Sequence, residues 1–327
     1  RCPALCGTAC PAAKRRPIRH IMLNTNGLRL AKEPEFVAAL QEFTPGFEVY
    51  LQFDSLQPHV LESLRGENLL DVRMRALENL NRVNLSTTLV VTLQKGLNDK
   101  EIGSIISFAL GQKCVRGVTF QPTQIAGRVE GFQPATDRIT LTEVRQEILN
   151  QAPVFQPEDI IPVPCNPDAL AMAYALKIDG EVFPLTRYLN PQDLLDNSRN
   201  TIVYEQDERL HSHMVQLFST GNSVECATDE LHSIMCCLPH IDAPTLGYDN
   251  LFRIIIMRFI DAYDFDVRAI KKSCVHIVSM EDDKIIPFET MNLFYRDPAK
   301  RAYLEQLRNP DLSNGAKLQM AKSNINQ

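Results

Sequence analysis

Residues 67–93 read ENLLDVRMRALENLNRVNLSTTLVVTL, and this stretch decides the fold class. In its first part, 67–83, apolar residues recur at helical spacing. Its second part, 85–93, is a nearly uninterrupted apolar run rich in β-branched residues, which is typical of a buried strand. The stretch therefore predicts a helix that leads directly into a buried strand.

The same alternation continues on both sides of this stretch. We expect further strands at 18–23, 47–53 and 117–121, and further helices at 34–43 and 98–111. Four strands then alternate with three helices at intervals of about thirty residues, which indicates βαβ crossovers. The sequence thus predicts an α/β fold with a parallel sheet, either doubly wound or curved into a barrel.

Each of these strands is followed by polar residues. Ligands of such sheets bind at the carboxyl ends of the strands, so these residues are the first candidates for a site. Any one of them alone is more readily explained as a turn former. The signal is that four consecutive strand ends are polar. The residues are Asn24, Thr25, Asn26, Gln52, Asp54, Gln94, Lys95, Gln121 and Thr123.

The chain length of 327 residues favours two domains. Thr140 and Glu143 form a capping box for a helix through Asn150, and several prolines follow as a linker. We therefore place a boundary near residue 150. The expected parts are an irregular leader at 1–16, a first domain at 17–150, a second at 151–308, and a polar tail at 309–327.

Charge and hydropathy exclude several classes of protein. The chain carries 34 Lys+Arg and 40 Asp+Glu, a net charge of −6, which argues against a nonspecific nucleic-acid coat or a polybasic membrane-surface protein. The longest strongly apolar run, 251–260, is half of what a bilayer span needs. No secretory signal is recognisable at the start of the chain. We expect a cytoplasmic protein with reduced cysteines, no transmembrane segment and no nucleic-acid partner.

Five of the nine cysteines lie in the second half of the chain. Asn166 and Pro167 predict the start of a helix through Leu176, which places Cys165 at a helix N-terminus that favours a metal-binding thiolate. No Cys-x2-Cys pair occurs, so the strong zinc pattern is missing. Each thiol alone could be a buried structural one, but five inert thiols are less expected. The candidates are Cys165, Cys226, Cys236, Cys237 and Cys274.

Several segments together resemble a known family. The segments 20–27 (HIMLNTNG), 50–54 (YLQFD), 89–92 (LVVT) and 118–122 (VTFQP) resemble successive strands of a radical S-adenosylmethionine (radical SAM) enzyme. The segments 165–168 (CNPD), 273–276 (SCVH) and 292–296 (NLFYR) resemble the cysteine-bearing C-terminal part of the subgroup that contains the tetraether lipid synthases. The resemblance covers about residues 17–300.

This resemblance implies a fold, cofactors and partners. The fold is a partial (β/α) barrel of the radical SAM type, with about four βα units present, followed by a smaller α+β domain that contains cysteines. The cofactors are S-adenosyl-L-methionine and a [4Fe-4S] cluster, which together generate a 5′-deoxyadenosyl radical for C–H activation. The implied partners are a small-molecule or lipid substrate and an electron donor such as ferredoxin or flavodoxin.

The resemblance also assigns roles to residues. Cofactor or substrate would contact Asn24, Thr25, Asn26, Gly27, Gln52 and Asp54. Gln121 would lie near the adenine side of the cofactor. Auxiliary iron–sulfur clusters would be held by Cys165, Cys226, Cys236, Cys237 and Cys274. Ala169 stands where a further cysteine is expected, which weakens the case for a full auxiliary ligand set.

Two family motifs are missing. The sequence contains neither Cys-x3-Cys-x2-Cys nor a Gly-Gly-Glu turn. Its nearest substitute, Cys2-x3-Cys6-x3-Cys10, has a second gap that is one residue too long, and Cys10 falls at the amino end of the first expected strand. We therefore expect that the chain begins at the family's third strand and is inactive as it stands.

Two other hypotheses remain open. The chain could be a non-catalytic iron–sulfur or zinc-binding protein that uses only its C-terminal cysteines. It could also be a fragment that does not fold, because the loss of two barrel units exposes an apolar sheet edge.

Overall fold

The structure is a computed structural model. It describes residues 10–16, 18, 20–125, 132–163, 166–178, 180–187, 248–273, 275–279, 284–296 and 299. The strands are β1 (Ile21–Thr25), β2 (Phe47–Gln52), β3 (Thr87–Leu93), β4 (Val115–Pro122), β5 (Ile161–Pro162), β6 (Leu170–Ile178), β7 (Glu181–Pro184), β8 (Leu251–Met257), β9 (His276–Ser279) and β10 (Lys284–Pro287).

Helices connect these strands. The α-helices are α2 (Leu28–Lys32), α3 (Pro34–Gln41), α4 (Pro58–Arg65), α5 (Leu70–Val83), α6 (Ile102–Leu110), α7 (Pro134–Asp137), α8 (Leu141–Gln151), α12 (Val267–Ile270) and α13 (Phe288–Thr290). Short 3-10 turns are η1 (Asp99–Glu101), η2 (Pro157–Asp159), η3 (Leu185–Arg187) and η7 (Tyr248–Asn250), and η8 (Met291–Tyr295) is a π-helical turn.

The predicted α/β fold with a parallel sheet is confirmed. Strands β1, β2, β3 and β4 are neighbours in chain order and all pair in parallel. Their alternate apolar residues, such as Val49 and Leu51 of β2, join one hydrophobic core with the helices. Leu77 and Leu80 of α5 and Ile105 of α6 belong to the same core. The burial of this shared apolar surface is the main stabilisation of the layer of helices on the sheet.

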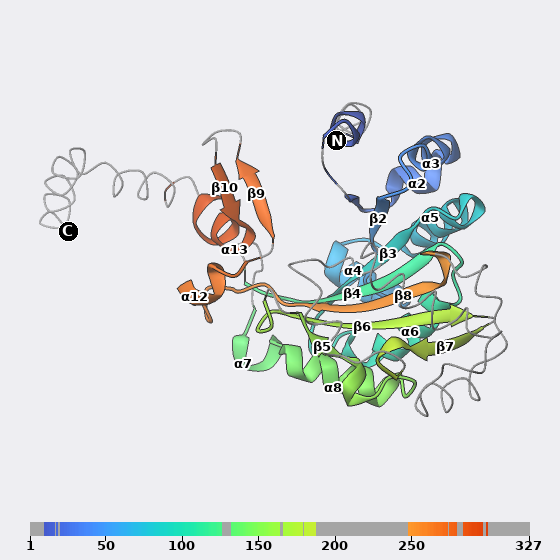
Figure 1. The fold of residues 1–327 in the computed structure, drawn as a ribbon. Helices are drawn as coiled ribbons and strands as arrows, with labels where there is room; N and C mark the ends of the chain where they lie inside the picture. Colours follow the sequence, from blue (N-terminus) through green and yellow to red (C-terminus); the bar gives the residue numbers. More distant parts are fainter. Residues whose placement is uncertain are drawn as a thin grey trace, which may run out of the picture. The chain divides into compact units, whose positions relative to one another are not determined.

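The sheet continues beyond the four predicted strands. Its order is β1-β2-β3-β4-β8-β6-β5, and β7 also pairs with β6 (Figure 1). Strand β8 is parallel to β4, whereas β6 is antiparallel to β8. The result is a mixed sheet that is consistent with a partial (β/α) barrel extended by an antiparallel part.

A buried ion pair joins distant strands of this sheet. Arg253 of β8 donates from Nη2 to Glu48 of β2 at 2.6 and 2.8 Å, although β3 and β4 lie between them. On a flat sheet, three strand spacings would separate β2 from β8 by about 14 Å. The direct contact therefore favours a sheet that curves toward the face on which Glu48 and Arg253 lie. Gly117 of β4, in register with Arg253, has no side chain to obstruct the bridge. A Cβ at Gly117 would come within 2.5 Å of the Arg253 carbonyl oxygen.

One predicted helix is wrong. Residues Asn166–Leu176 were expected to be helical, but a turn at 167–169 leads into strand β6. Eight of its nine residues are buried, so both faces of β6 are covered, and its edges pair with β8 and with β5 and β7. A strand covered on both faces has no alternating pattern, so its apolar run cannot be distinguished from a buried helix by periodicity.

Other boundaries differ in detail. Helices α2 and α4 were not predicted, and the expected linker after residue 150 carries η2 and β5. Residues 10–14 of the expected irregular leader are helical, while residues 1–9 and the expected tail at 309–327 lie outside the described residues. None of the helices that the structure describes is both long enough and apolar enough to cross a membrane.

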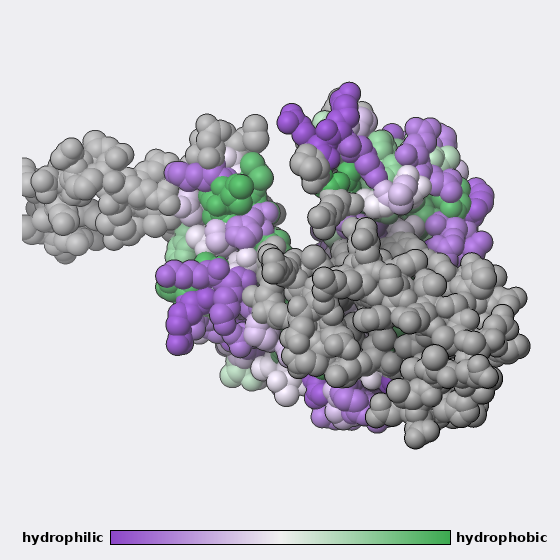
Figure 2. Space-filling view, in the orientation of Figure 1, coloured by the Kyte–Doolittle hydropathy of each residue, from purple (hydrophilic) through white to green (hydrophobic). Residues whose placement is uncertain are grey.

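The chain divides into two compact units, which do not coincide with a boundary near residue 150. Unit 1 comprises 1–123 and 135–258, and unit 2 comprises 124–134 and 259–327. In unit 2, β9 and β10 form an antiparallel hairpin. Its paired residues Val278 and Ile285 are exposed, and Figure 2 shows a hydrophobic patch at the hairpin.

Candidate cofactor-binding site

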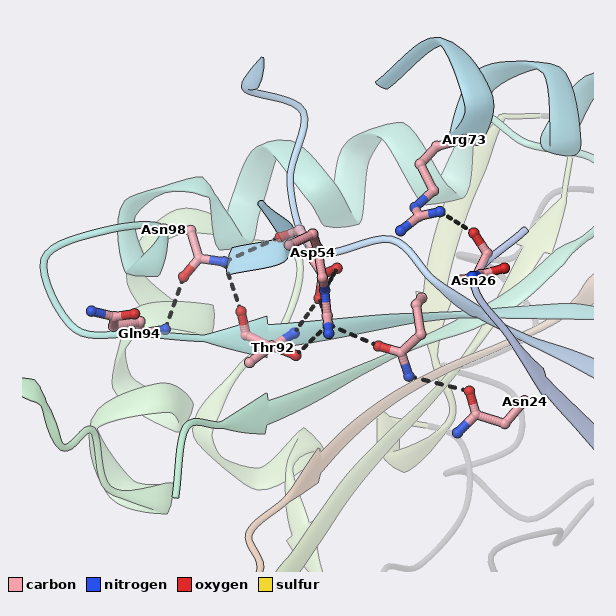
Figure 3. A network of polar contacts seen from close by, with 9 residues as sticks. Asn24, Asn26, Asp54, Arg73, Thr92, Gln94 and Asn98 are labelled. Atoms are coloured by element: carbon pink, nitrogen blue, oxygen red, sulfur yellow. Dashed lines mark hydrogen bonds and ion pairs between the residues drawn. The ribbon is translucent and has the colours of Figure 1, made fainter. Parts of the chain in front are cut away.

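The carboxyl ends of β1 and β2 bring two predicted site residues into contact. Gln52 Nε2 donates to Asn24 Oδ1 at 3.2 Å. The oxygen of the same Gln52 amide accepts from Arg65 Nη2 at 3.1 Å. The predicted site is thus part of a hydrogen-bonded network at this edge of the sheet (Figure 3).

Asp54 is the centre of this network. Its side chain is fully buried, and its backbone has a φ of 67°, in the left-handed region that non-glycine residues seldom adopt. Arg65 at the end of α4 donates to both carboxylate oxygens, at 2.7 and 2.6 Å. The backbone N–H of Thr92 donates to Asp54 Oδ1 at 3.1 Å. The carboxylate therefore joins the ends of β2, β3 and α4.

Asn98 closes the network on the side of β3. Its amide nitrogen donates to the carbonyl oxygens of Asp54 (3.1 Å) and Thr92 (2.8 Å). Its amide oxygen accepts from the backbone N–H of Gln94 at 2.9 Å. Asn98 is fully buried, so these bonds fix the loop after β3 instead of offering groups to a ligand.

The Asn24–Gly27 turn after β1 rests on a buried arginine. Gly27 has a φ of 80°, and a Cβ there would lie 2.8 Å from Leu51 Cδ1, so the turn requires glycine. Arg73 of α5 donates from Nη1 to the carbonyl oxygen of Asn26. The Arg73 residue is only 1% exposed, and its Nε has no hydrogen-bond partner in the described part of the chain.

The charges around the turn do not cancel. Asp54 is hydrogen-bonded to Arg65 and interacts electrostatically with Arg73, so its one negative charge is set against two guanidinium groups. The hydrogen bonds that Arg65 donates to Asp54 raise the pKa of Arg65, whereas burial lowers the pKa of Arg73. A buried cation with an unpaired N–H is costly, so an acceptor that reached Arg73 would stabilise it.

The residues after β3 and β4 are less connected. Gln121 Nε2 contacts only the sulfur of Met257, at 4.0 Å, and makes no hydrogen bond to the network among the described residues. Lys95 pairs with Glu143 of α8 at 2.7 Å. The buried Thr123 Oγ1 has no partner within the described part of the chain. The side of β4 therefore retains polar groups that a ligand could engage.

The predicted metal ligands cannot be placed. Cys165, Cys226, Cys236, Cys237 and Cys274 all lie outside the described residues. The described residues contain no group of three or more His, Cys, Asp or Glu side chains that could hold a metal ion.

The two cysteines that the structure does describe lie toward the amino ends of the strands, away from the candidate site. Cys114 directly precedes β4, and burial raises the pKa of its thiol to about 11. Cys10 is buried in the core, and Lys14 of the same helical segment donates to the carbonyl oxygen of Pro45, just before β2. The described residues therefore do not fit a [4Fe-4S] cluster at the carboxyl edge, and no reaction step is assigned to one.

Sequence reasoning missed Arg65, Arg73 and Asn98. A signal for Arg73 existed, because it is three, four and seven residues before Ala76, Leu77 and Leu80 on the apolar stripe of α5. An arginine on a core-facing stripe indicates a buried charge with a specific partner. Arg65 and Asn98 gave no such signal, since their contacts depend on how the loops fold back.

Comparison with known proteins found a family model and a relative that match parts of this chain. Residues 7–109 match the sequence model of the radical SAM superfamily. This range of the chain includes β1, β2 and β3 with their polar ends. The chain is also 27% identical over 324 residues to a protein from Methanocaldococcus jannaschii named 7,8-dihydro-6-hydroxymethylpterin dimethyltransferase. That match covers 87% of this chain and 63% of the relative's length. The chain is thus similar to the radical SAM superfamily over residues 7–109 and to this methyltransferase over most of its length.

Proposed function

We propose that unit 1 binds S-adenosylmethionine at the carboxyl ends of β1–β4, as part of a radical SAM enzyme. The observation that carries the proposal is the buried Arg73, whose guanidinium fixes the Asn26 carbonyl while its Nε lacks a partner among the described residues. A cofactor with a carboxylate and several ring acceptors suits such an edge. In this superfamily the bound cofactor supplies a 5′-deoxyadenosyl radical when it meets a reduced [4Fe-4S] cluster.

The roles of the chain's own residues follow from the network. Asp54 and Arg65 hold the ends of β2 and β3 at a fixed separation, and Asn24 and Gln52 present amides beside them. Gln121 and Thr123 offer polar atoms at the β4 side for the adenine ring. These residues bind and orient. We propose that the five C-terminal cysteines hold auxiliary iron–sulfur clusters only, and not the cluster that cleaves the cofactor.

The substrate is proposed from chemistry and from the relative's name. The relative is named for a dihydropterin, and a polar hydrogen-bonding edge suits a polar ring of that kind. A lipid substrate, which the tetraether subgroup resemblance suggests, would need an apolar lining that the Asn24–Gln52–Arg65 edge does not provide. We therefore propose a small heterocyclic substrate, with ferredoxin or flavodoxin as the electron donor.

Cofactor binding tests this function directly. The full chain is titrated with S-adenosylmethionine by isothermal titration calorimetry under anaerobic conditions. We expect saturable binding, and Arg73→Met is expected to weaken it about tenfold or more because a charged hydrogen bond is lost. Arg268→Met is the control, since Arg268 is an exposed arginine whose side chain is 90% accessible. A wild-type chain that does not bind the cofactor contradicts the proposal.

Reconstitution with iron and sulfide, read together with the cofactor titration, separates the proposed function from a metal-binding protein that is not an enzyme. Because the Cys-x3-Cys-x2-Cys motif is absent from the sequence, we expect iron to bind without release of 5′-deoxyadenosine when a reductant is added. Binding of iron or zinc together with no affinity for S-adenosylmethionine would favour a metal-binding protein that is not an enzyme. Release of deoxyadenosine would show that other thiols of the chain form the cluster.

A further inference from the structure

Arg65 fixes the direction in which the neighbouring amides point. A guanidinium can only donate hydrogen bonds, so the Gln52 group that faces Arg65 Nη2 at 3.1 Å must be the oxygen. The Gln52 nitrogen then faces Asn24 and donates to its oxygen at 3.2 Å. The Asn24 oxygen is thereby used, and its NH₂ group is directed away from Gln52. One arginine thus sets the polarity of two amides on two strands.

The side-chain polar atoms that make no hydrogen bond at all on this side of the edge, in the described part of the chain, are nitrogen donors. Asn26 Oδ1 accepts from the backbone N–H of Leu28 at 3.2 Å, which leaves its NH₂ group. Within the described residues, the NH₂ groups of Asn24 and Asn26 and Nη1 of Arg65 have no hydrogen-bond partner. Three neighbouring positions therefore offer N–H groups.

The nearby acceptors, in contrast, each already accept at least one hydrogen bond. Both carboxylate oxygens of Asp54 accept from Arg65, and the Thr92 hydroxyl accepts from Arg65 Nη2 at 3.0 Å. Thr25 Oγ1 accepts from the backbone N–H of Gly27 at 3.2 Å. On the β3 and β4 side the pattern differs, because the side-chain oxygens of Gln94 and Gln121 accept no hydrogen bond among the described residues.

A ligand can reach these donors. Asn24 and Asn26 are exposed, and the Arg65 side chain is 32% accessible despite its four hydrogen bonds. In Figure 3 Asn24, near the end of β1, and Asn26, directly after β1, lie beside the Asp54 network. The excess positive charge of Arg65 and Arg73 over Asp54 favours an anionic acceptor.

We propose that Asn24, Asn26 and Arg65 form a donor array that binds acceptor oxygens of a ligand, preferentially a carboxylate. The array deepens the proposed function, on which it rests, because it names the ligand chemistry that this side of the site accepts. The oxygens can belong to the methionyl carboxylate of the cofactor or to the substrate. Preorganised donors are effective because Asp54, Gln52 and Thr92 fix the guanidinium before the ligand arrives.

The test replaces a donor by an acceptor of the same shape. Asn24→Asp keeps the oxygen that accepts from Gln52 and changes the outward NH₂ into a carboxylate oxygen. Asn150→Asp is the matched control, because Asn150 is also exposed and its Oδ1 also accepts from a glutamine, Gln146, at 3.0 Å. Calorimetry of the full chain compares three ligands: S-adenosylmethionine, 5′-methylthioadenosine, which lacks the carboxylate, and 7,8-dihydro-6-hydroxymethylpterin.

The outcomes separate the array from the proposed function. We expect Asn24→Asp to weaken the binding of S-adenosylmethionine or of the dihydropterin about tenfold or more. The affinity for methylthioadenosine should stay within about twofold, and Asn150→Asp should change none of the affinities. The ligand whose affinity falls is the one whose oxygens the array binds. If methylthioadenosine binds and Asn24→Asp lowers the affinity for no ligand, or for all three equally, the proposal of a donor array is wrong and the proposed function stands. If the wild-type chain binds none of the three, both are wrong.

Discussion

Asp54 combines two costly features, a buried carboxylate and a backbone in the left-handed region. Such features persist where the surrounding structure determines them, and they are frequent at functional sites. Here the four hydrogen bonds of Asp54 with Arg65, Thr92 and Asn98 determine the conformation. We infer that the strain is retained because it holds the guanidinium of Arg65 at the edge of the sheet.

Asp54→Asn tests the charge of this residue separately from its backbone. Asparagine adopts the left-handed region more readily than most residues, so the variant removes the negative charge without new strain. We expect a loss of about 1–3 kcal/mol in the free energy of unfolding, measured by urea denaturation, since a charged hydrogen bond to a partly exposed arginine is lost. Asp54→Ala should lose more. Equal stability of Asp54→Asn and wild type would mean that the ion pair contributes nothing.

Glu48 makes the stability of the fold depend on pH. Although burial alone would raise the pKa of Glu48, Arg253 and the hydrogen bonds from His20 and Thr88 lower it from 4.5 to about 2. Because the pKa is lower in the folded state, the pair stabilises the protein above about pH 4.5, and this stabilisation is lost as the pH falls to about 2. The shift corresponds to about 3 kcal/mol.

The expected result is a steep loss of stability below about pH 4.5 that Glu48→Gln lacks. Denaturation midpoints measured from pH 7 to pH 2 should show the variant less stable than wild type at pH 7, with the difference shrinking toward pH 2. Glu62→Gln is the control, because Glu62 is exposed on α4. Parallel pH profiles for Glu48→Gln and wild type would contradict the role of the buried pair.

At the scale of elements, the first four strands were predictable because local signals agreed. Apolar runs, turn residues and helix stripes recur in the order β1 to β4, and the structure confirms each. The missed helix α4 also carried signals, with Pro58 in its first turn and Gly66 in the left-handed conformation at its end. Strand β6 was not predictable locally. Its sequence, LAMAYALKI, contains good helix formers, and only pairing with β7 and β8 makes it a strand.

Gly117 allows β4 to pair with β8. A Cβ at this position would lie 2.5 Å from the Arg253 carbonyl oxygen and 3.1 Å from its Cβ, so Gly117→Ala must push the strands apart. We expect a loss of about 1–3 kcal/mol in unfolding free energy by urea denaturation. Gly111→Ala is the control, since a Cβ there would meet its nearest atom at 3.4 Å. If both variants are equally stable, β4 and β8 do not approach as described.

The capping box of α8 is a predicted feature that the structure confirms. Thr140 Oγ1 accepts from the Glu143 N–H at 3.2 Å, and Glu143 accepts from the Thr140 N–H at 2.7 Å. Thr140→Ala should therefore cost about 1 kcal/mol in unfolding free energy, whereas Thr140→Ser, which keeps the hydroxyl, should cost less. Urea denaturation of both variants is the measurement. An alanine variant as stable as the serine one would show that the hydroxyl does not stabilise the helix.

At the scale of the molecule, the strand order predicted which polar side chains gather at one edge, but not the hydrogen bonds among them. The topology of parallel strands brings Asn24, Gln52 and Asp54 to one edge, which strand order alone predicts. The donor polarity depends on Arg65 and on the loop after β3, whose contacts arise only when the chain is folded. The auxiliary-cluster role of the C-terminal cysteines stays a prediction, because these cysteines lie outside the described residues.

Hydrogen–deuterium exchange of the full chain with and without S-adenosylmethionine measures where the ligand binds. We predict slower exchange in peptides that cover the turn after β1, the Asp54 region, the loop after β3 and the end of β4 at Gln121. Peptides at the amino ends of the same strands, such as those around Pro45 and Cys114, should not change. Protection at those amino ends, with no change at the carboxyl ends, would contradict the account.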